Sequence, residues 1–174
     1  MTGVAPVVVL VGAPGSGKST VGRALAERLG VDFRDTDADV EAEAGVPISE
    51  QFVTEGERAF RARERTAVAR ALQEHDGVLA LGGGAVLDGA TRERLRGQRV
   101  CWLAVSATVA GARVGLGAGR PLLLGNVRSK LVTLLRERTP LYEEVADVTV
   151  STDQGSVQEV VDAVVAALAE QDAP

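Results

Sequence analysis

The chain has 174 residues, of which 45% are hydrophobic and 25% charged, an ordinary balance for a globular protein with a sizeable core. Its net charge of −5 disfavours a protein whose main task is to grip nucleic acid, because phosphate contacts need a basic face. No apolar run approaches membrane-spanning length, so we expect no membrane partner. Cys101 is the single cysteine, and the N-terminus has no basic region ahead of an apolar one. Both features favour the cytoplasm.

In chain order, apolar runs predict strands at residues 7–11, 31–35, 78–81, 99–105 and 147–151. Segments with helical spacing lie between these runs, and a last helix is expected over roughly 156–170. Strands that alternate with helices predict an α/β fold, with a mostly parallel sheet covered by helices on both faces. No repeat or linker divides the chain, so we expect a single domain over 1–174. The four glycines of residues 115–126 predict a mobile loop flanked by helices.

The first predicted strand leads directly into a P-loop, because residues 12–19 read Gly-Ala-Pro-Gly-Ser-Gly-Lys-Ser. The glycines allow backbone N–H groups to close around a phosphate chain, and the helix beginning near Lys18 points its positive end at the same anion. We expect Lys18 to neutralise charge between the outer phosphates and the Ser19 hydroxyl to ligate Mg²⁺. A glycine-rich turn that binds nothing would explain neither residue.

Two carboxylates follow the second predicted strand, in the sequence Asp35-Thr36-Asp37. Residues i and i+2 of a strand face the same way, so both side chains are expected to project toward the P-loop. Asp35 is then placed to hold Mg²⁺ through its waters, and Asp37 to accept the proton of an attacking hydroxyl. The alternative is that Asp37 or Asp39 caps a helix starting near Val40.

Two absences narrow the class of P-loop protein. The chain lacks the Asn-Lys-x-Asp element of guanine-specific switch proteins. Its third predicted strand ends in the glycines 82–84, where motor-type ATPases place a magnesium-binding aspartate. Three successive glycines let a ligand lie against bare backbone, so they favour a second ligand pressed close to the sheet.

Arginines supply the candidate groups for a negatively charged acceptor. Arg61 lies three residues before Glu64 on a predicted helix, so the two can pair, and a held guanidinium is a good two-pronged partner for a carboxylate. Arg58, Arg63 and Arg65 on the same helix are interpreted as a solvated face.

Two later arginines lie near the glycine-rich loop. Arg120 belongs to the loop itself, and an arginine delivered by a mobile loop can stabilise charge on a transferring phosphoryl group. Arg138 is predicted near the end of the following helix, where a cation is favourable whether or not it has a function.

Taken together, these motifs resemble those of the shikimate kinases over almost the full length, from Val7 to about residue 170. The resemblance implies a three-layer α/β/α fold like that of nucleoside monophosphate kinases, with a five-stranded parallel sheet in the order 2-3-1-4-5. It also implies a mobile lid at about 115–126 and a shikimate-binding helical segment at about 37–65. The implied reaction is the ATP-dependent phosphorylation of the 3-hydroxyl of shikimate in aromatic amino-acid biosynthesis, with Mg²⁺, by a monomer.

The resemblance also implies roles for single residues. Asp37 would bond the shikimate hydroxyls as the candidate base, with Lys18 and Arg120 as its catalytic partners. The shikimate carboxylate would be held by Arg61 and Arg138 beside the backbone of Gly83, in a pocket shaped or braced by Phe52, Phe60 and Glu64. Ser19 and Asp35 would hold the metal. The nucleotide would contact Gly15, Ser16, Gly17, Lys18, Ser19, Thr20, Arg113 and Arg120.

The chain departs from the family pattern in its lid, which is richer in glycine than usual. This suggests a more mobile open lid and weaker ATP binding. Residues 152–156 should line the adenine site, but they cannot be matched one by one to residues of the family. A kinase for another hydroxy acid such as gluconate is the nearest alternative, and a non-catalytic nucleotide-binding module is an alternative of another class.

Overall fold

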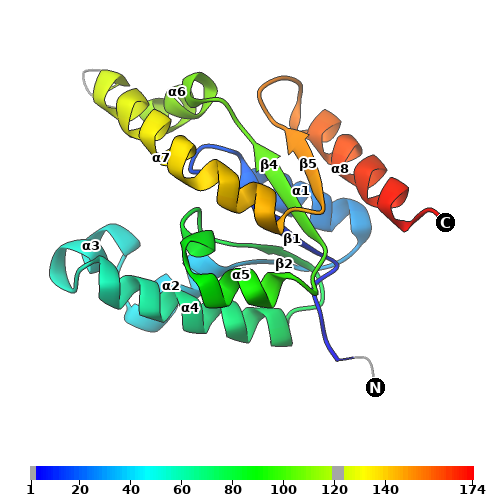
Figure 1. Ribbon diagram of the computed structural model, residues 1–174, viewed down its shortest axis with the longest axis horizontal. Coiled ribbons are helices and arrows are strands. Elements are labelled where there is room, and N and C mark those ends of the chain that lie inside the picture. The colour runs from blue at the N-terminus through cyan, green and yellow to red at the C-terminus, as the bar shows by residue number, and fades with distance from the viewer. Residues whose placement is uncertain (1–2, 119–123) are drawn as a thin grey trace.

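The computed structural model describes residues 3–118 and 124–174. Their centre is a five-stranded parallel sheet in the order β2-β3-β1-β4-β5 (Figure 1). Parallel register places Val9 of β1 opposite Leu79 of β3 and Val100 of β4. The strands are β1 (Val8–Val11), β2 (Phe33–Asp35), β3 (Val78–Ala80), β4 (Val100–Ala104) and β5 (Val148–Ser151).

Helices cover both faces of the sheet, because each face of a parallel sheet carries apolar side chains that must be buried. Inward residues of α1 (Lys18–Leu29) and α8 (Val157–Asp172) share one core cluster with alternate residues of β1, such as Val8 and Leu10. The opposite face of β1, with Val9 and Val11, packs with residues of α4 (Glu57–Glu74), α5 (Gly89–Leu95) and α7 (Leu124–Val145). The predicted three-layer fold and strand order are confirmed.

A short helical segment stands beside this core. It comprises α2 (Thr36–Ala44), α3 (Ile48–Thr54) and the beginning of α4, around a small cluster of buried Val40, Phe60 and Ala67. On the other side of the P-loop edge lie α6 (Ala107–Ala118) and the start of α7 (Figure 1). The remaining element is the 3-10 turn η1 (Ala85–Leu87). No helix in the described ranges is long and apolar enough to cross a bilayer.

Three local predictions need correction. Helix α2 begins at Thr36, and the carboxylate of Asp35 caps it by accepting from the Asp37 N–H, so Asp37 lies in a first helical turn rather than on a strand. Helix α7 runs through Pro140 to Val145, so Arg138 is not near its end. Helix α6 continues to Ala118 and α7 starts at Leu124, so less of the predicted loop is left outside helices. The rest of that loop, including Arg120, lies outside the described residues.

Candidate active site

The P-loop joins the end of β1 to α1 in a conformation that depends on glycine. Gly15 and Gly17 have φ values of 80° and 88°, in the left-handed region that residues with a Cβ rarely adopt. A Cβ on Gly15 would also lie only 2.8 Å from the carbonyl oxygen of Ala110 in α6. The loop is therefore shaped by its glycines and packed against α6, as an anion-binding turn requires.

Lys18 folds back over this loop. Its Nζ donates to the carbonyl oxygens of Gly12, at 2.6 Å, and Ala13, at 3.2 Å. Burial lowers the pKa of Lys18 to about 8, the carboxylates of Asp37 and Asp35 oppose this shift, and Arg138 adds to it. The P-loop lysine thus shares one electrostatic environment with both predicted carboxylates.

Asp35 is held between two helices. Its Oδ2 accepts from the Ser19 hydroxyl at 3.0 Å, and its Oδ1 accepts from the Asp37 N–H at 2.9 Å. This hydroxyl–carboxylate pair supplies oxygen ligands of the kind that Mg²⁺ prefers. No cluster of three or more His, Cys, Asp or Glu suited to a metal occurs in the described part of the chain.

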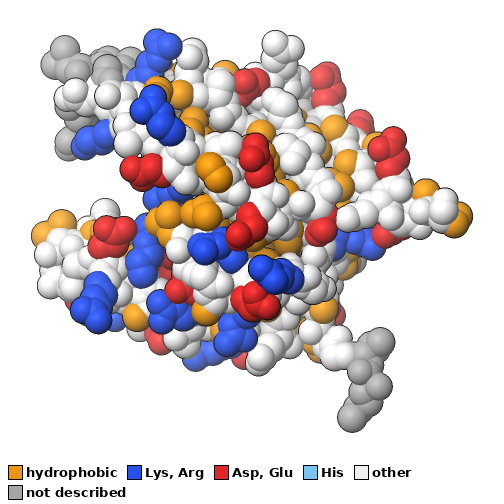
Figure 2. Space-filling view, viewed as in Figure 1, with side chains coloured by type: hydrophobic (Ala, Val, Ile, Leu, Met, Phe, Trp, Pro, Cys, Tyr) orange, Lys and Arg blue, Asp and Glu red, His pale blue; other side chains and the backbone are white. Residues whose placement is uncertain are grey.

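A cavity of about 440 Å³ at the carboxyl ends of the strands brings together the predicted phosphate-binding residues and the two carboxylates, whereas Arg61 and Arg138 do not line it. It is lined by P-loop residues with Lys18 and Ser19, by Asp35 and Asp37, and by Arg113. Figure 2 shows the surface hollowed between the part formed by α2–α4 and the part formed by α6–α7, with Lys and Arg side chains gathered around the hollow. Ligands of open α/β sheets bind at this edge.

Asp37 is a partly buried carboxylate that lines the P-loop cavity. Its pKa is raised from 3.8 to about 6, chiefly by burial and also by the neighbouring carboxylates of Asp35 and Glu64, against the opposing effect of Lys18. A carboxylate with a pKa near neutrality is a better general base than an exposed one. The prediction that Asp35 and Asp37 face the P-loop together holds, although a helical turn rather than a strand places Asp37.

The glycines after β3 give this site its second wall. A Cβ on Gly82 would overlap the carboxylate of Asp37, and one on Gly84 would overlap the guanidinium of Arg61. A Cβ on Gly83 would lie 3.4 Å from Nη1 of Arg138. The three glycines therefore let side chains from α2, α4 and α7 converge on one stretch of backbone.

Arg61 is held from several sides. Its Nη1 donates to Oε1 of the buried Glu64 at 2.8 Å, and its guanidinium carbon lies 5.2 Å from the ring centre of Phe60 and 5.9 Å from that of Phe52. Its buried Nε lies 3.5 Å from Oε1 of Glu57 and makes no hydrogen bond within the described residues. Arg61 thus keeps donor capacity that its protein partners do not use, as expected of a carboxylate receptor.

Helix α7 supplies the opposite side of the wall. Arg138 is half-buried, and one turn later the fully buried Tyr142 donates its hydroxyl to the Gly83 carbonyl at 2.6 Å. The ring of Trp102 on β4 stacks on Tyr142 with the ring centres 5.8 Å apart. This contact fixes α7 to the glycine wall, and the sequence offered no signal for it.

A smaller cavity of about 180 Å³ continues from the P-loop toward the C-terminal helix. Its lining joins Thr20 and Arg113 to Thr152, Gly155 and Ser156, the segment predicted to line the adenine site. Arg113 donates to the carbonyl oxygens of Gly15 at 2.9 Å and Thr152 at 2.5 Å.

Thr152 was missed as an individual residue. Its buried hydroxyl donates to the Ser16 carbonyl at 2.8 Å, so it ties the segment after β5 to the P-loop. A lone threonine after a strand carries no pattern that would have identified it.

Two arginines assigned to solvent have structural partners. Arg65 pairs with Asp88 at 2.8 Å, and Arg63 pairs with Glu55 at 2.8 Å and donates to Gln51 at 2.7 Å. Among the three arginines of the predicted solvated face, only Arg58 has no ion pair within the described residues.

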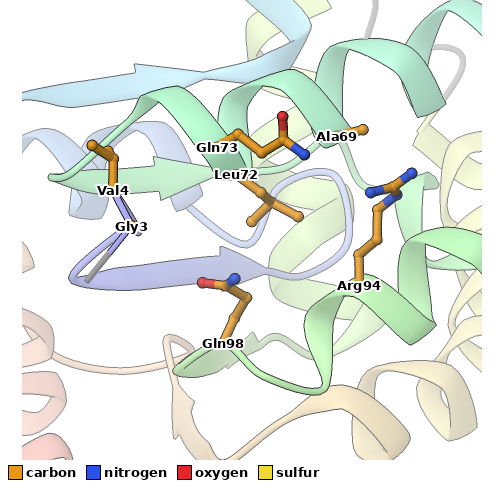
Figure 3. A pocket seen from close by; sticks show the side chains of 7 residues that line it. All are labelled: Gly3, Val4, Ala69, Leu72, Gln73, Arg94 and Gln98. Carbon is orange, nitrogen blue, oxygen red and sulfur yellow. The ribbon is translucent and has the colours of Figure 1, made fainter. Parts of the chain in front are cut away.

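A cavity of about 390 Å³ lies at the opposite edge of the sheet (Figure 3). It is lined by Gly3 and Val4 before β1, by Gln98 before β4, and by residues of α4 and α5 such as Leu72 and Arg94. These positions precede the strands, and none of the predicted site residues lines this cavity.

A P-loop whose cavity holds two carboxylates, beside a glycine stretch on which Asp37, Arg61 and Arg138 converge, on a 2-3-1-4-5 sheet, is the arrangement expected of a P-loop kinase for a small acidic acceptor. The family model for shikimate kinase matches residues 14–169. A shikimate kinase from Salinispora tropica is 63% identical over 150 residues, covering 86% of this chain and 90% of that protein. One from Thermobifida fusca is 57% identical over 154 residues, covering 88% and 90%.

Among solved structures, shikimate kinase from Acinetobacter baumannii in complex with shikimate is 36% identical, with a TM-score of 0.89, and the match covers 98% of this chain and 96% of that one. The chain belongs to the shikimate kinase family. Membership confirms the predicted enzyme class, with ATP as co-substrate. It decides against both alternatives, the gluconate kinase and the non-catalytic nucleotide-binding module.

Proposed function

We propose that this chain transfers the γ-phosphoryl group of ATP to the 3-hydroxyl of shikimate, in aromatic amino-acid biosynthesis. The observation that carries the proposal is the convergence of Asp37, Arg61 and Arg138 on the three glycines after β3, beside Lys18 of the P-loop. Shikimate carries a carboxylate and several hydroxyls, so its site needs cations at one end and a hydrogen-bond acceptor at the other.

For the acceptor, we assign the carboxylate to Arg61 and Arg138, since guanidinium groups bind carboxylates with two parallel hydrogen bonds. The backbone of Gly83 forms the surface beside the ring. Asp37 then accepts a hydrogen bond from the hydroxyl that faces the P-loop. Glu64 positions Arg61 through their 2.8 Å hydrogen bond.

For the donor, we assign the phosphates to the backbone of Gly15, Ser16 and Gly17 and to the start of α1 with Thr20. The adenine is assigned to the cavity beside Arg113 and the 152–156 segment. Arg120 lies outside the described residues, and we propose for it the role expected from the sequence, at the transferring phosphoryl group.

For Mg²⁺, the hydroxyl of Ser19 and the carboxylate of Asp35 form a suitable oxygen pair. We propose that they hold the ion, Asp35 through water. When bound, the ion supplies positive charge to the phosphate oxygens.

The chemical step is an in-line displacement. A bond forms between the acceptor oxygen and the γ-phosphorus, the bond from that phosphorus to the β-phosphate oxygen breaks, and ADP leaves. Asp37 orients the attacking hydroxyl and takes its proton, and Lys18 offsets charge on the phosphates. Most of the catalysis is positioning and electrostatic stabilisation.

The direct test is ADP release from MgATP with shikimate or gluconate added at equal concentration. We expect release that depends on shikimate, because two arginines and one carboxylate match its functional groups. Release that depends equally on gluconate, or on neither acid, would contradict the assignment. A folded, ATP-binding sample is the control for the second outcome.

Replacing Gly84 with alanine is expected to weaken shikimate binding selectively. The new Cβ would overlap the guanidinium of Arg61, which is the end of a flexible side chain, so the fold survives but the arginine moves. We expect KM for shikimate to rise about tenfold, with KM for ATP unchanged. Gly97→Ala is the matched control, because nothing lies within 4 Å of its added Cβ. Equal kinetics for the two variants would contradict the assignment of Arg61 to the shikimate carboxylate.

We further propose that the protein is one kinase domain with a lid at about 115–126, working as a monomer in the cytoplasm. The buried position of Cys101, whose thiol pKa burial raises to about 12, is in keeping with a reducing compartment.

A further inference from the structure

Helix α3 is a short element that apolar packing alone does not fix. It has seven residues, its Val53 side chain is 87% exposed, and Ile48 and Phe52 are only partly buried against the small cluster around Phe60. Isolated helices of this length are unstable in water. Other contacts must therefore determine where α3 lies.

Gln51, in the middle of α3, provides such a contact. Its side chain is fully buried, its Nε2 donates to the Val46 carbonyl at 3.0 Å, and its Oε1 accepts from Nη1 of Arg63 at 2.7 Å. Both ends of the amide are thus used, so removing either partner leaves a buried polar group unsatisfied.

Arg63 connects this amide to the end of the same helix. Its guanidinium also donates to both carboxylate oxygens of Glu55, at 2.8 Å and 3.3 Å, and Glu55 is the C-cap residue of α3. One side chain of α4 therefore holds both the middle and the end of α3. We call these three residues, Gln51, Glu55 and Arg63, the α3 clasp.

The clasp lies next to the group that contacts Arg61. Phe52 follows Gln51, and its ring centre is 4.6 Å from that of Phe60. The guanidinium of Arg61 lies over both rings. A shift of α3 would move Phe52 and take away one of the two aromatic surfaces that orient Arg61.

We propose that the α3 clasp is a positioning device for acceptor binding, acting through Phe52 on Arg61. The inference rests on the proposed function, because it takes Arg61 as the receptor of the acceptor carboxylate. Gln51, Glu55 and Arg63 are positioning residues, since none of them lines the cavity beside Asp37 or the cavity beside Arg61.

The test is Arg63→Met, which keeps the length of the aliphatic stem and removes the donors. We expect KM for shikimate to rise about threefold to tenfold, with kcat within about twofold and KM for ATP unchanged. Glu55→Gln, which spares the Gln51 contact, should give a smaller rise. Arg70→Met is the matched control, because Arg70 is exposed on the same helix and has no ion pair within the described residues.

A second variant separates positioning from general damage. Replacing both partners, in Gln51→Met with Arg63→Met, removes the unsatisfied amide but also the whole clasp, so KM for shikimate should stay raised; a return to the wild-type value would show that the unsatisfied amide, and not loss of positioning, had raised it. Hydrogen exchange of residues 46–56 should be faster in Arg63→Met than in Arg70→Met. Faster exchange with an unchanged KM, or a parallel loss of kcat and of both KM values, would overturn the proposal.

The proposed function has its own readout. Shikimate-dependent ADP release by the wild-type protein is measured before any variant is compared, so a wrong acceptor and a wrong role for the clasp give different results.

Discussion

Replacing Asp37 with asparagine is expected to reduce kcat by about a hundredfold to ten-thousandfold while the fold remains intact. Asparagine keeps the shape of the side chain and loses its ability to take a proton. The measurement is steady-state ADP release with shikimate at saturation. Near-normal turnover would remove Asp37 from the mechanism.

Asp39→Asn is the matched control for this experiment. Asp39 lies in the same helix, but its carboxylate accepts from Arg34 at 2.8 Å and does not line the P-loop cavity. We expect it to leave kcat within about twofold of the wild-type value.

The stability of the Asp37→Asn protein distinguishes a lost base from a damaged fold. Because the folded-state pKa of Asp37 is raised from 3.8 to about 6, its charge opposes folding, and this penalty develops as pH rises through that range. At pH 7 the penalty is fully present. The free energy of unfolding of the variant should therefore be about 1–2 kcal/mol larger than that of the wild type, which makes the variant more stable. A less stable variant would mean that turnover was lost through misfolding.

Replacing Lys18 with methionine is expected to lower kcat/KM for ATP by about a hundredfold to a thousandfold. The change removes the ammonium group placed over the P-loop, and it leaves Asp37 and Asp35 without an opposing charge. ADP release across a range of ATP concentrations measures the effect. The exposed Lys130, the other lysine of the chain, supplies the control Lys130→Met. Similar kinetics for both variants would contradict the role of Lys18.

Much of the fold could be predicted because local pattern and tertiary structure agree. Each predicted strand is present within two residues at either end, and the P-loop motif lies between strand and helix as expected. The parallel order follows from alternation of strands and helices together with the resemblance. Periodicity is reliable where a whole element faces the core.

The errors arose where tertiary contacts override local signals. Pro140 suggests a helix end because it lacks an N–H, yet α7 continues to Val145, where the buried Tyr142 anchors it to Gly83. Asp35 was expected to share a strand face with Asp37, but an aspartate is also a strong N-cap, and it starts α2 one residue later.

The site was predictable in its residues and not in its geometry. Spacing identified Arg61 with Glu64, and the pair is present at 2.8 Å. Spacing could not show that Gly82 and Gly84 make room for Asp37 and Arg61, since those contacts join separate elements. Arg63 was misassigned for the same reason, because its partners belong to α3 rather than to its own helix.

The stacking of Trp102 on Tyr142 gives this chain an internal optical reporter. Trp102 is the only tryptophan, so all indole emission comes from one position. Its neighbour Tyr142 bonds directly to the Gly83 backbone that we assign to the acceptor. We expect occupation of that backbone surface to alter the surroundings of this single fluorophore, so that an intrinsic titration follows acceptor binding without ATP, label or turnover.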